Sequence, residues 1–167
     1  MCYKDPQITA GKNMSESLRT KIMRWGFNFF PVYRRTGARI TYIADDFREV
    51  RIKLPLNWKT KNYVGSIFGG SIYAAVDPIY MVMFIKLLGP QYIVWDKAAS
   101  IRFKHPGRST LRAVFKIQAA ELDDIRETLK KQKKLDRTYG VDFIDEAGKV
   151  CATVEKVIHF QKKNDQP

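Results

Sequence analysis

The chain has 167 residues, enough for one domain with a substantial core. Its composition of 45% hydrophobic, 13% aromatic and 28% charged residues excludes a disordered protein. Two cysteines, Cys2 and Cys151, are too few for a disulfide framework, so we expect a reducing, cytoplasmic location and a buried Cys151. The first twenty residues contain scattered charges and no apolar run, and we therefore expect no export signal.

The net charge of +13 concerns partners and says nothing about the fold. Its lysines and arginines are scattered, with small clusters at Arg34-Arg35 and around 130–134. A solvated basic surface, a site for an anionic ligand such as coenzyme A, and a nucleic-acid interface all fit this charge. No aromatic-rich RNA motif is present, and we expect no nucleic-acid partner.

The N-terminal part predicts a tail followed by a helix. We expect residues 1–12 to be a flexible tail and residues 13–167 to form a single domain. An amphipathic helix is predicted over 13–30, with Ser15 as N-cap and Pro31 as its stop. Its apolar residues recur at helical spacing, and we expect this aromatic face to dock on the rest of the protein: Leu18, Ile22, Trp25 and Phe29.

Alternating apolar residues then predict strands through most of residues 38–160. The expected order is a hairpin with its turn at Asp45-Asp46, an apolar helix, two strands, a polar surface helix over 121–135 and a final hairpin. The strands are expected over 39–44, 49–54, 92–104, 111–117, 139–143 and 150–160. We therefore predict an α+β fold in which one antiparallel sheet wraps around one long central helix.

The central apolar segment, from Ile67 to Ile85, contains a single charge, Asp77. Its 19 residues approach the length that spans a bilayer. However, glycines stand near its start, Pro78 follows the mid-segment charge, and a charge at bilayer mid-depth is costly. We therefore expect a helix buried in protein, ended by Gly89-Pro90, and no membrane partner.

The start of this helix has the features of a ligand site. Gly65, Gly69 and Gly70 let the backbone approach a ligand closely. The free N–H groups of a helix that begins here point outward and favour negative charge.

Asp77 lies eight residues after Gly69, inside the apolar run. A buried carboxylate is costly unless it is hydrogen-bonded or used, and burial raises a carboxyl pKa, which suits a base or nucleophile. Alternatively, Asp77 supports the kink that Pro78 imposes on the helix. The spacing leaves both interpretations open.

These residues resemble the hotdog-fold thioesterases of the phenylacetic-acid-pathway (PaaI-like) type. That family has the motif Asn-x-x-Gly-x-x-His-Gly-Gly, followed by an acid nine residues after the histidine. The residues in register are Asn62, Gly65, Gly69, Gly70 and Asp77. The segment is most similar to an uncharacterised, DUF4442-like subgroup in which phenylalanine replaces the histidine, as Phe68 does here.

The resemblance implies roles for individual residues. The Gly69 N–H would polarise a thioester carbonyl, Asp77 would activate water or attack directly, and Asn62 would position the thioester or the water. It also implies a site between protomers of a homodimer or tetramer. The resemblance places further positions beside the substrate: Gly65, Phe68, Gly70, Ser71 and Met81.

Two departures from the family pattern concern the chemistry. Phe68 replaces the usual histidine, and Met81 stands where some related enzymes place a water-orienting serine or threonine. The leading hypothesis is hydrolysis of an acyl-CoA or acyl-carrier-protein thioester without a cofactor. The alternative is a non-catalytic acyl-CoA or lipid-binding protein. A wall for the acyl chain is expected from Ile72, Val76, Ile79 and Met83.

The remaining chemistry-bearing residues suggest no second site. His105 and His159 stand far apart, with no cysteine or acid at ligand spacing, and we expect no bound metal. Ser66 and Ser71 lack a neighbouring base in the sequence, which disfavours a serine nucleophile.

Overall fold

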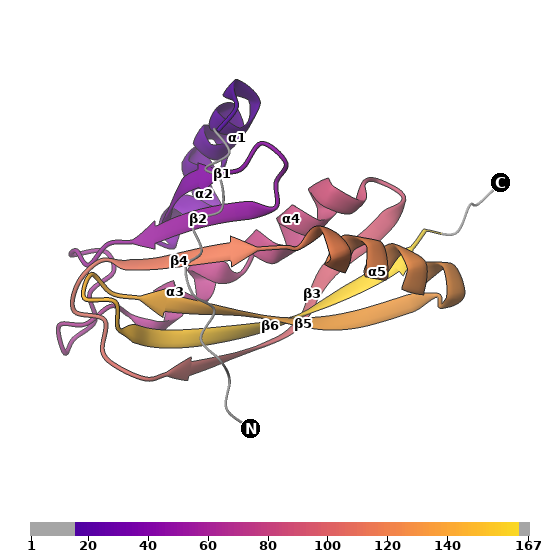
Figure 1. Ribbon diagram of the computed structural model, residues 1–167. Coiled ribbons are helices and arrows are strands. Elements are labelled where there is room, and N and C mark those ends of the chain that lie inside the picture. The colour runs from indigo at the N-terminus through magenta and orange to yellow at the C-terminus, as the bar shows by residue number, and fades with distance from the viewer. Residues whose placement is uncertain (1–15, 164–167) are drawn as a thin grey trace.

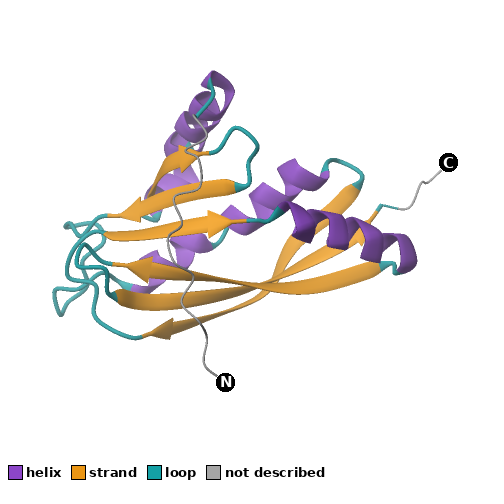
Figure 2. Cartoon of the chain, viewed as in Figure 1, coloured by secondary structure: helices purple, strands orange, loops and turns teal. Residues whose placement is uncertain are grey.

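The computed structural model describes residues 16–163, and the predicted tail at 1–12 lies outside them. Six antiparallel strands form one sheet in the order β1-β2-β4-β5-β6-β3, and it curves around a long apolar helix, as predicted (Figures 1 and 2). The strands are β1 (Arg39–Ile43), β2 (Glu49–Leu54), β3 (Tyr92–Phe103), β4 (Leu111–Lys116), β5 (Lys134–Ile144) and β6 (Val150–Lys162).

The predicted first hairpin forms, because β1 and β2 pair in antiparallel register. In β2 the predicted alternation holds, with Val50, Ile52 and Leu54 buried. In β1 a register shift between Ile40 and Tyr42 breaks it, so that Ile43 and not Tyr42 is buried. This one irregularity changes which β1 side chains reach the core.

The central helix begins at Gly69, with Phe68 as N-cap, and is interrupted at Asp77-Pro78. It consists of α3 (Gly69–Val76) and α4 (Ile79–Leu88), and Gly89 ends it at φ 91°. Together the 20 residues are long and apolar enough to cross a membrane. Their inner side instead packs in the core through Ile72, Ala75, Val76, Ile79, Tyr80, Met83, Phe84 and Leu88.

The N-terminal helix α1 (Leu18–Phe29) lies along the outer edge of β1 and is followed by α2 (Pro31–Arg35). Ser17 is its N-cap and accepts a hydrogen bond from the Thr20 N–H, whereas the predicted cap, Ser15, lies outside the described residues. The Asn28 side chain bonds both the N–H and the carbonyl of Ile40, at 2.8 and 2.9 Å. Helix α1 thereby provides hydrogen-bond partners for backbone groups of an edge strand that would otherwise be unpaired.

The prediction that the aromatic face of α1 docks on the protein is wrong. Leu18, Ile22, Trp25 and Phe29 are 59–74% exposed. The opposite face contacts the body, through the buried Thr20 and the half-buried Met23 and Phe27. Polar pairing with the edge of β1 therefore decides which way α1 faces.

The surface helix α5 (Ala119–Lys131) ends four residues before the predicted boundary at 135. Its predicted apolar stripe of Leu122, Ile125 and Leu129 is buried. Strand β5 begins already at Lys134 because it pairs with β6 along its whole length, and Leu135 faces Phe160 there. Long-range strand pairing thus overrides the local helical pattern.

Aromatic side chains fill the core where α4 meets the sheet. Phe84 lies 4.9 Å from Tyr139 and 4.8 Å from Phe160, measured between ring centroids. Cys151 is 1% exposed, which confirms it as a core residue, and burial raises the pKa of its thiol. This core fixes the helix against the concave face of the sheet.

Candidate active site

The loop before α3 is built around Asn62. Its Oδ1 accepts hydrogen bonds from the N–H groups of Val64 and Ser66, at 3.1 and 3.0 Å. Its Nδ2 donates to Ser66 Oγ at 2.9 Å, and Gly65 turns the chain at φ 81°. The Asn62 amide is therefore engaged in shaping the loop, an arrangement typical of an Asx turn.

The first turn of α3 presents free backbone donors. Within residues 16–163, the N–H groups of Gly69 and Gly70 have no hydrogen-bond acceptor, and the N–H of Ser71 bonds the Phe68 carbonyl at 3.0 Å. The ring of Phe103 covers the Cα of Gly69 so closely that a Cβ there would lie 2.6 Å from its Cζ. The ring of Phe68 covers Gly70 in the same way.

Asp77 is the C-cap of α3 and lies on the side that faces β6 and β3. The apolar run predicts a buried carboxylate, but the Asp77 side chain is 52% exposed in the single chain. Its Oδ1 accepts a hydrogen bond from Lys156 Nζ at 2.9 Å. One oxygen is therefore held by a cation, and the structure gives Oδ2 no partner among residues 16–163.

Lys156 is a buried cation in β6, 1% exposed. Its Nζ lies 2.9 Å from Asp77 Oδ1, 3.3 Å from Asp96 Oδ2 and 5.4 Å from the centre of the Tyr73 ring. Burial lowers its pKa, but the hydrogen bond that Lys156 donates to Asp77 and the two negative charges outweigh that effect and raise the pKa. Lys156 is therefore an ammonium ion at neutral pH.

Asp96 completes the cluster from β3, next to a register shift between Asp96 and Ala98. The shift makes Lys97 an extra residue, and its Nζ pairs with Asp136 at 2.5 Å. Asp96 Oδ1 is buried without a hydrogen-bond partner in the described chain. Burial therefore raises the pKa of Asp96 despite the lowering effect of Lys156. Bulges often re-aim a side chain in this way beside functional sites.

The structure brings only some of the predicted residues together. Phe68, Gly69, Gly70 and Ser71 share the first turn of α3, next to the Asn62–Gly65 loop. Asp77 stands eight residues from Gly69, which at 1.5 Å per residue is roughly 12 Å along the helix.

Met81 lies another turn further on, half-buried against the core. The predicted acyl-chain wall is wrong, because its members are packed in the core: Ile72, Val76, Ile79 and Met83. Beside Ile79 and Met83 lies an apolar cavity of only about 20 Å³, too small for an acyl chain.

Sequence reasoning missed Lys156 and Asp96. Lys156 could have been found, because it alternates with Val154 and Ile158 along a predicted strand and so points to the same, buried side of the sheet. A lysine in such a position must have an acidic partner inside the protein. Asp96 gave no such signal, since the bulge that turns it inward is not visible in the sequence.

The two histidines lie apart from this cluster. His159 Nδ1 lies 2.6 Å from Asp136 Oδ1, and its ring stacks on Trp95 at 4.2 Å. No three potential ligand side chains gather around a point in the part of the chain that the structure describes.

A model of the DUF4442 family, a domain of unknown function, matches residues 19–160. The chain belongs to this family. No curated protein sequence matches this DUF4442 chain.

Solved structures, among them a thioesterase, share the hotdog fold of this DUF4442 chain. One is a protein of unknown function from Pseudomonas aeruginosa, described as a probable thioesterase, with TM-score 0.79 and 17% identity over 89% of this chain and 99% of that one. A thioesterase from Haemophilus influenzae has TM-score 0.65 and 13% identity over 91% and 96%. The PaaI protein of the E. coli phenylacetic acid degradation operon has TM-score 0.59 and 14% identity over 86% and 92%. The predicted hotdog fold is thereby confirmed.

The buried cluster predicts a specific pattern of stability. We expect Lys156→Met to lower the free energy of unfolding by about 2–4 kcal/mol, because it leaves Asp96 buried without its cation. Adding Asp96→Asn should restore about 1–2 kcal/mol of this loss. Urea denaturation at neutral pH, where Lys156 of the wild type is charged, measures both changes.

The defect of Lys156→Met should also shrink as the pH falls. Lys156 lowers the pKa of Asp96 in the wild type, so its removal raises this pKa further above that of the unfolded chain. Protonation of Asp96 as the pH falls therefore stabilises the folded variant more than the folded wild type. Lys97→Met, which breaks an exposed ion pair with Asp136, serves as control and should cost less than about 1 kcal/mol. Losses from Lys156→Met and Asp96→Asn that simply add would contradict the pairing.

Proposed function

We propose that this DUF4442 protein hydrolyses acyl thioesters of coenzyme A or of an acyl carrier protein. The observation that supports this most directly is the carboxyl group of Asp77, which is held by the buried Lys156 and open to solvent. The same helix begins with free glycine N–H groups at Gly69 and Gly70. A carboxylate and an oxyanion site are the two elements that thioester hydrolysis requires.

In the proposed reaction, Asp77 Oδ2 accepts a proton from a water molecule whose oxygen attacks the thioester carbonyl carbon. The carbonyl oxygen becomes negative and is stabilised by the Gly69 N–H and the N-terminal end of the helix. The tetrahedral intermediate then collapses, the carbon–sulfur bond breaks, and the thiolate leaves with the proton that Asp77 returns. Lys156 is a positioning residue, because it fixes Oδ1 and leaves Oδ2 free.

The proposed reaction needs a second copy of the chain. Gly69 and Asp77 lie roughly 12 Å apart along the helix, whereas both must come within hydrogen-bonding distance of one reacting group. We therefore propose a homodimer in which Gly69 of one protomer faces Asp77 of its partner. Strand β3 suits this assembly, because its outer edge pairs with no strand in residues 16–163 and most of its side chains are exposed.

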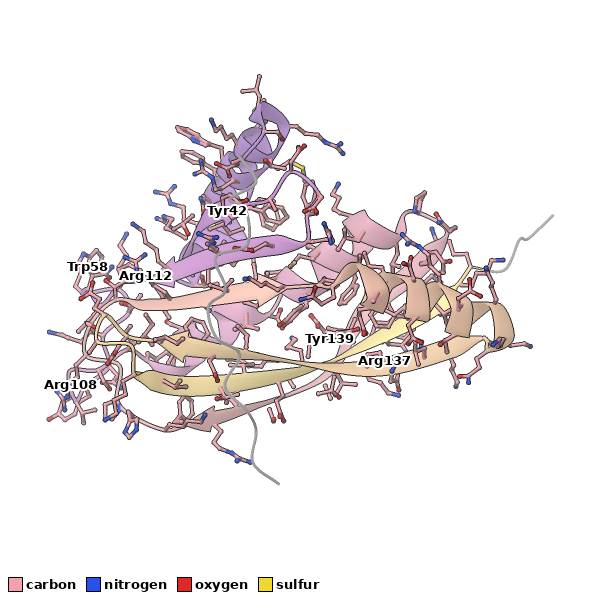
Figure 3. The ribbon with its side chains drawn as sticks, viewed as in Figure 1. Tyr42, Trp58, Arg108, Arg112, Arg137 and Tyr139 are labelled. Carbon is pink, nitrogen blue, oxygen red and sulfur yellow. The ribbon has the colours of Figure 1, made fainter. Side chains whose placement is uncertain are left out.

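Exposed apolar side chains surround the start of α3 and suit an acyl or aryl group. Phe68 is 57% exposed, Phe103 58% and Tyr73 39%. The guanidinium of Arg108 lies beside Gly65, at the loop end of the sheet (Figure 3). A cation there suits the phosphates of coenzyme A or the acidic surface of a carrier protein.

A non-catalytic acyl-CoA-binding protein is the second candidate, and one observation favours it. Phe68 stands where the similar enzymes have histidine, and its ring packs on Gly70. The Asp77 carboxylate is then the only titratable side chain that this proposal places at the reacting group. Tight binding of acyl-CoA with no turnover by the wild type would establish this second function and exclude the first.

Asp77→Asn tests the proposed base. With a panel of acyl-CoAs, we expect kcat to fall about a hundredfold or more while KM changes little, because proton acceptance is lost and binding is kept. Release of free thiol measures the rate. Asp142→Asn is the matched control, since this exposed carboxylate bonds Thr153 and should be dispensable. Full activity of Asp77→Asn would exclude the proposed role.

A pair of substitutions at Gly69 tests the oxyanion donor. Gly69→Pro removes the N–H, and proline is tolerated at the first position of a helix when the preceding residue is extended, as Phe68 is at φ −63°, ψ 128°. Gly69→Ala adds a Cβ against Phe103 but keeps the N–H, and it is the matched control. We expect kcat of the proline variant to fall about a hundredfold below that of the alanine variant. Equal rates would exclude the Gly69 N–H as donor.

Mixing two inactive variants tests whether the site is shared. Asp77→Asn and Gly69→Pro chains, unfolded and refolded together in equal amounts, form a mixed dimer that has one intact site. Random pairing predicts recovery of about a quarter of the wild-type activity. No recovery, in a mixture shown to contain mixed dimers, would mean that both residues act within one chain.

A further inference from the structure

Helix α1 exposes an apolar stripe to solvent. At 100° per residue, Leu18, Ile22, Trp25 and Phe29 fall within an arc of about 60°. All four are more than half exposed, and the rings of Trp25 and Phe29 lie 5.2 Å apart. The stripe continues past the end of the helix through Phe30 (57% exposed) and Val32 (66%). A contiguous exposed patch of this kind marks an interaction surface.

Cations surround the stripe. Within the described residues, the exposed Arg19, Lys21, Arg34 and Arg35 flank it, and none of these four side chains has a hydrogen bond or ion pair there. A hollow of about 280 Å³ opens beside Trp25 and Phe29. Its remaining lining is almost wholly basic: Arg24, Asn28, Arg34 and Arg39. Arg24 is paired with Glu16, whereas Arg34 is free to bind a phosphate.

We propose that this face of α1 and α2 docks on the surface of an anionic lipid bilayer, with the stripe in the headgroup region and the arginine-lined hollow around lipid phosphates. Charge complementarity favours this partner over a second copy of the chain. A symmetric contact through the same face would set four unpaired cations against four others, between molecules that each have a net charge of +13.

The composition of the face fits an interfacial helix. Tryptophan and phenylalanine beside leucine and isoleucine, with arginine and lysine at the flanks, are typical of helices that lie in the plane of the interface. The opposite face of α1 is tied to β1 through Asn28, so docking needs no rearrangement of the fold. This association differs from the membrane span that the sequence argument excluded for the central helix.

Vesicle binding of the whole protein tests the proposal. We expect co-sedimentation with vesicles of phosphatidylcholine that contain phosphatidylserine, and much weaker binding to phosphatidylcholine alone. The variant with Trp58→Phe and Trp95→Phe keeps Trp25 as its single tryptophan. The fluorescence emission of Trp25 should shift to the blue when vesicles are added. Before they are added, a water-soluble quencher should reach it freely. Shielded Trp25 without vesicles would overturn the proposal, because another part of the chain or a second copy would then cover the stripe.

Two pairs of variants separate docking from general adsorption. Trp25→Ala with Phe29→Ser should weaken vesicle binding about tenfold or more, because the inserted apolar area is lost. Trp58→Ala removes an even more exposed ring from the loop that follows β2 and should change nothing (Figure 3). Arg34→Glu with Arg35→Glu should weaken binding more than Lys131→Glu with Lys133→Glu, which alters a lysine-rich hollow near the end of α5.

Equal effects within either pair would overturn the proposal. The proposal would also be overturned if light scattering showed that the stripe substitutions act mainly by abolishing self-association of the protein. The stripe residues are exposed, so their substitution should leave thermal unfolding unchanged, and the arginine pair offers a test independent of the stripe. None of these variants touches Asp77 or Gly69, so thioesterase activity in solution should persist in all of them.

Discussion

The contact between Lys156 and Asp77 joins the two layers of this protein at the point where the central helix is broken. A buried ammonium ion is costly unless its charge is compensated, and here the compensation comes from the end of α3 and from the bulge in β3. The helix break supplies one carboxylate and the strand irregularity supplies the other. The two acids reach Lys156 only because the helix breaks after Asp77 and the strand bulges at Lys97. The charge of Lys156 therefore links the position of the helix break to that of the bulge.

This cluster also explains how an acid inside an apolar run can face solvent. Pro78 lacks an N–H and interrupts the helix directly after Asp77, which becomes the C-cap of α3. The two interpretations of Asp77 that the sequence left open are therefore compatible. The residue stands at the kink, and the kink turns its carboxylate toward Lys156 while half of the side chain stays accessible.

The elements that could be predicted from the sequence are those whose pattern is local. The β1–β2 hairpin, the start of α3 at Gly69 and the end of α4 at Gly89 follow from alternation and from glycine and proline chemistry. The orientation of α1 does not. Its apolar stripe indicates a buried face, but hydrogen bonds between Asn28 and the edge of β1 hold that stripe in solvent. A choice between faces that depends on a partner strand cannot be read from periodicity alone.

The same limit applies to the site. Lys156 and Asp77 are 79 positions apart, and only the sheet brings them together. In β3, the alternation of Ala99, Ile101 and Phe103 continued backwards would turn Asp96 outward, and the extra residue at Lys97 reverses this parity. The sequence could therefore identify Asp77 as an acid that needs a partner. Strand pairing brings Lys156 to it, and the bulge in β3 adds Asp96 to the same cluster.

The two edges of the sheet have different neighbours, and so they suit different contacts. At β1 the edge is occupied by α1, whose exposed stripe faces away from the sheet. At β3 the edge has no partner strand in the described chain and lies next to Asp96, Phe103 and the open side of α3. Pairing of two copies at β3 would bury the site side of each protomer and leave both α1 stripes exposed. The proposed catalytic assembly and the proposed membrane contact therefore use opposite edges and do not compete.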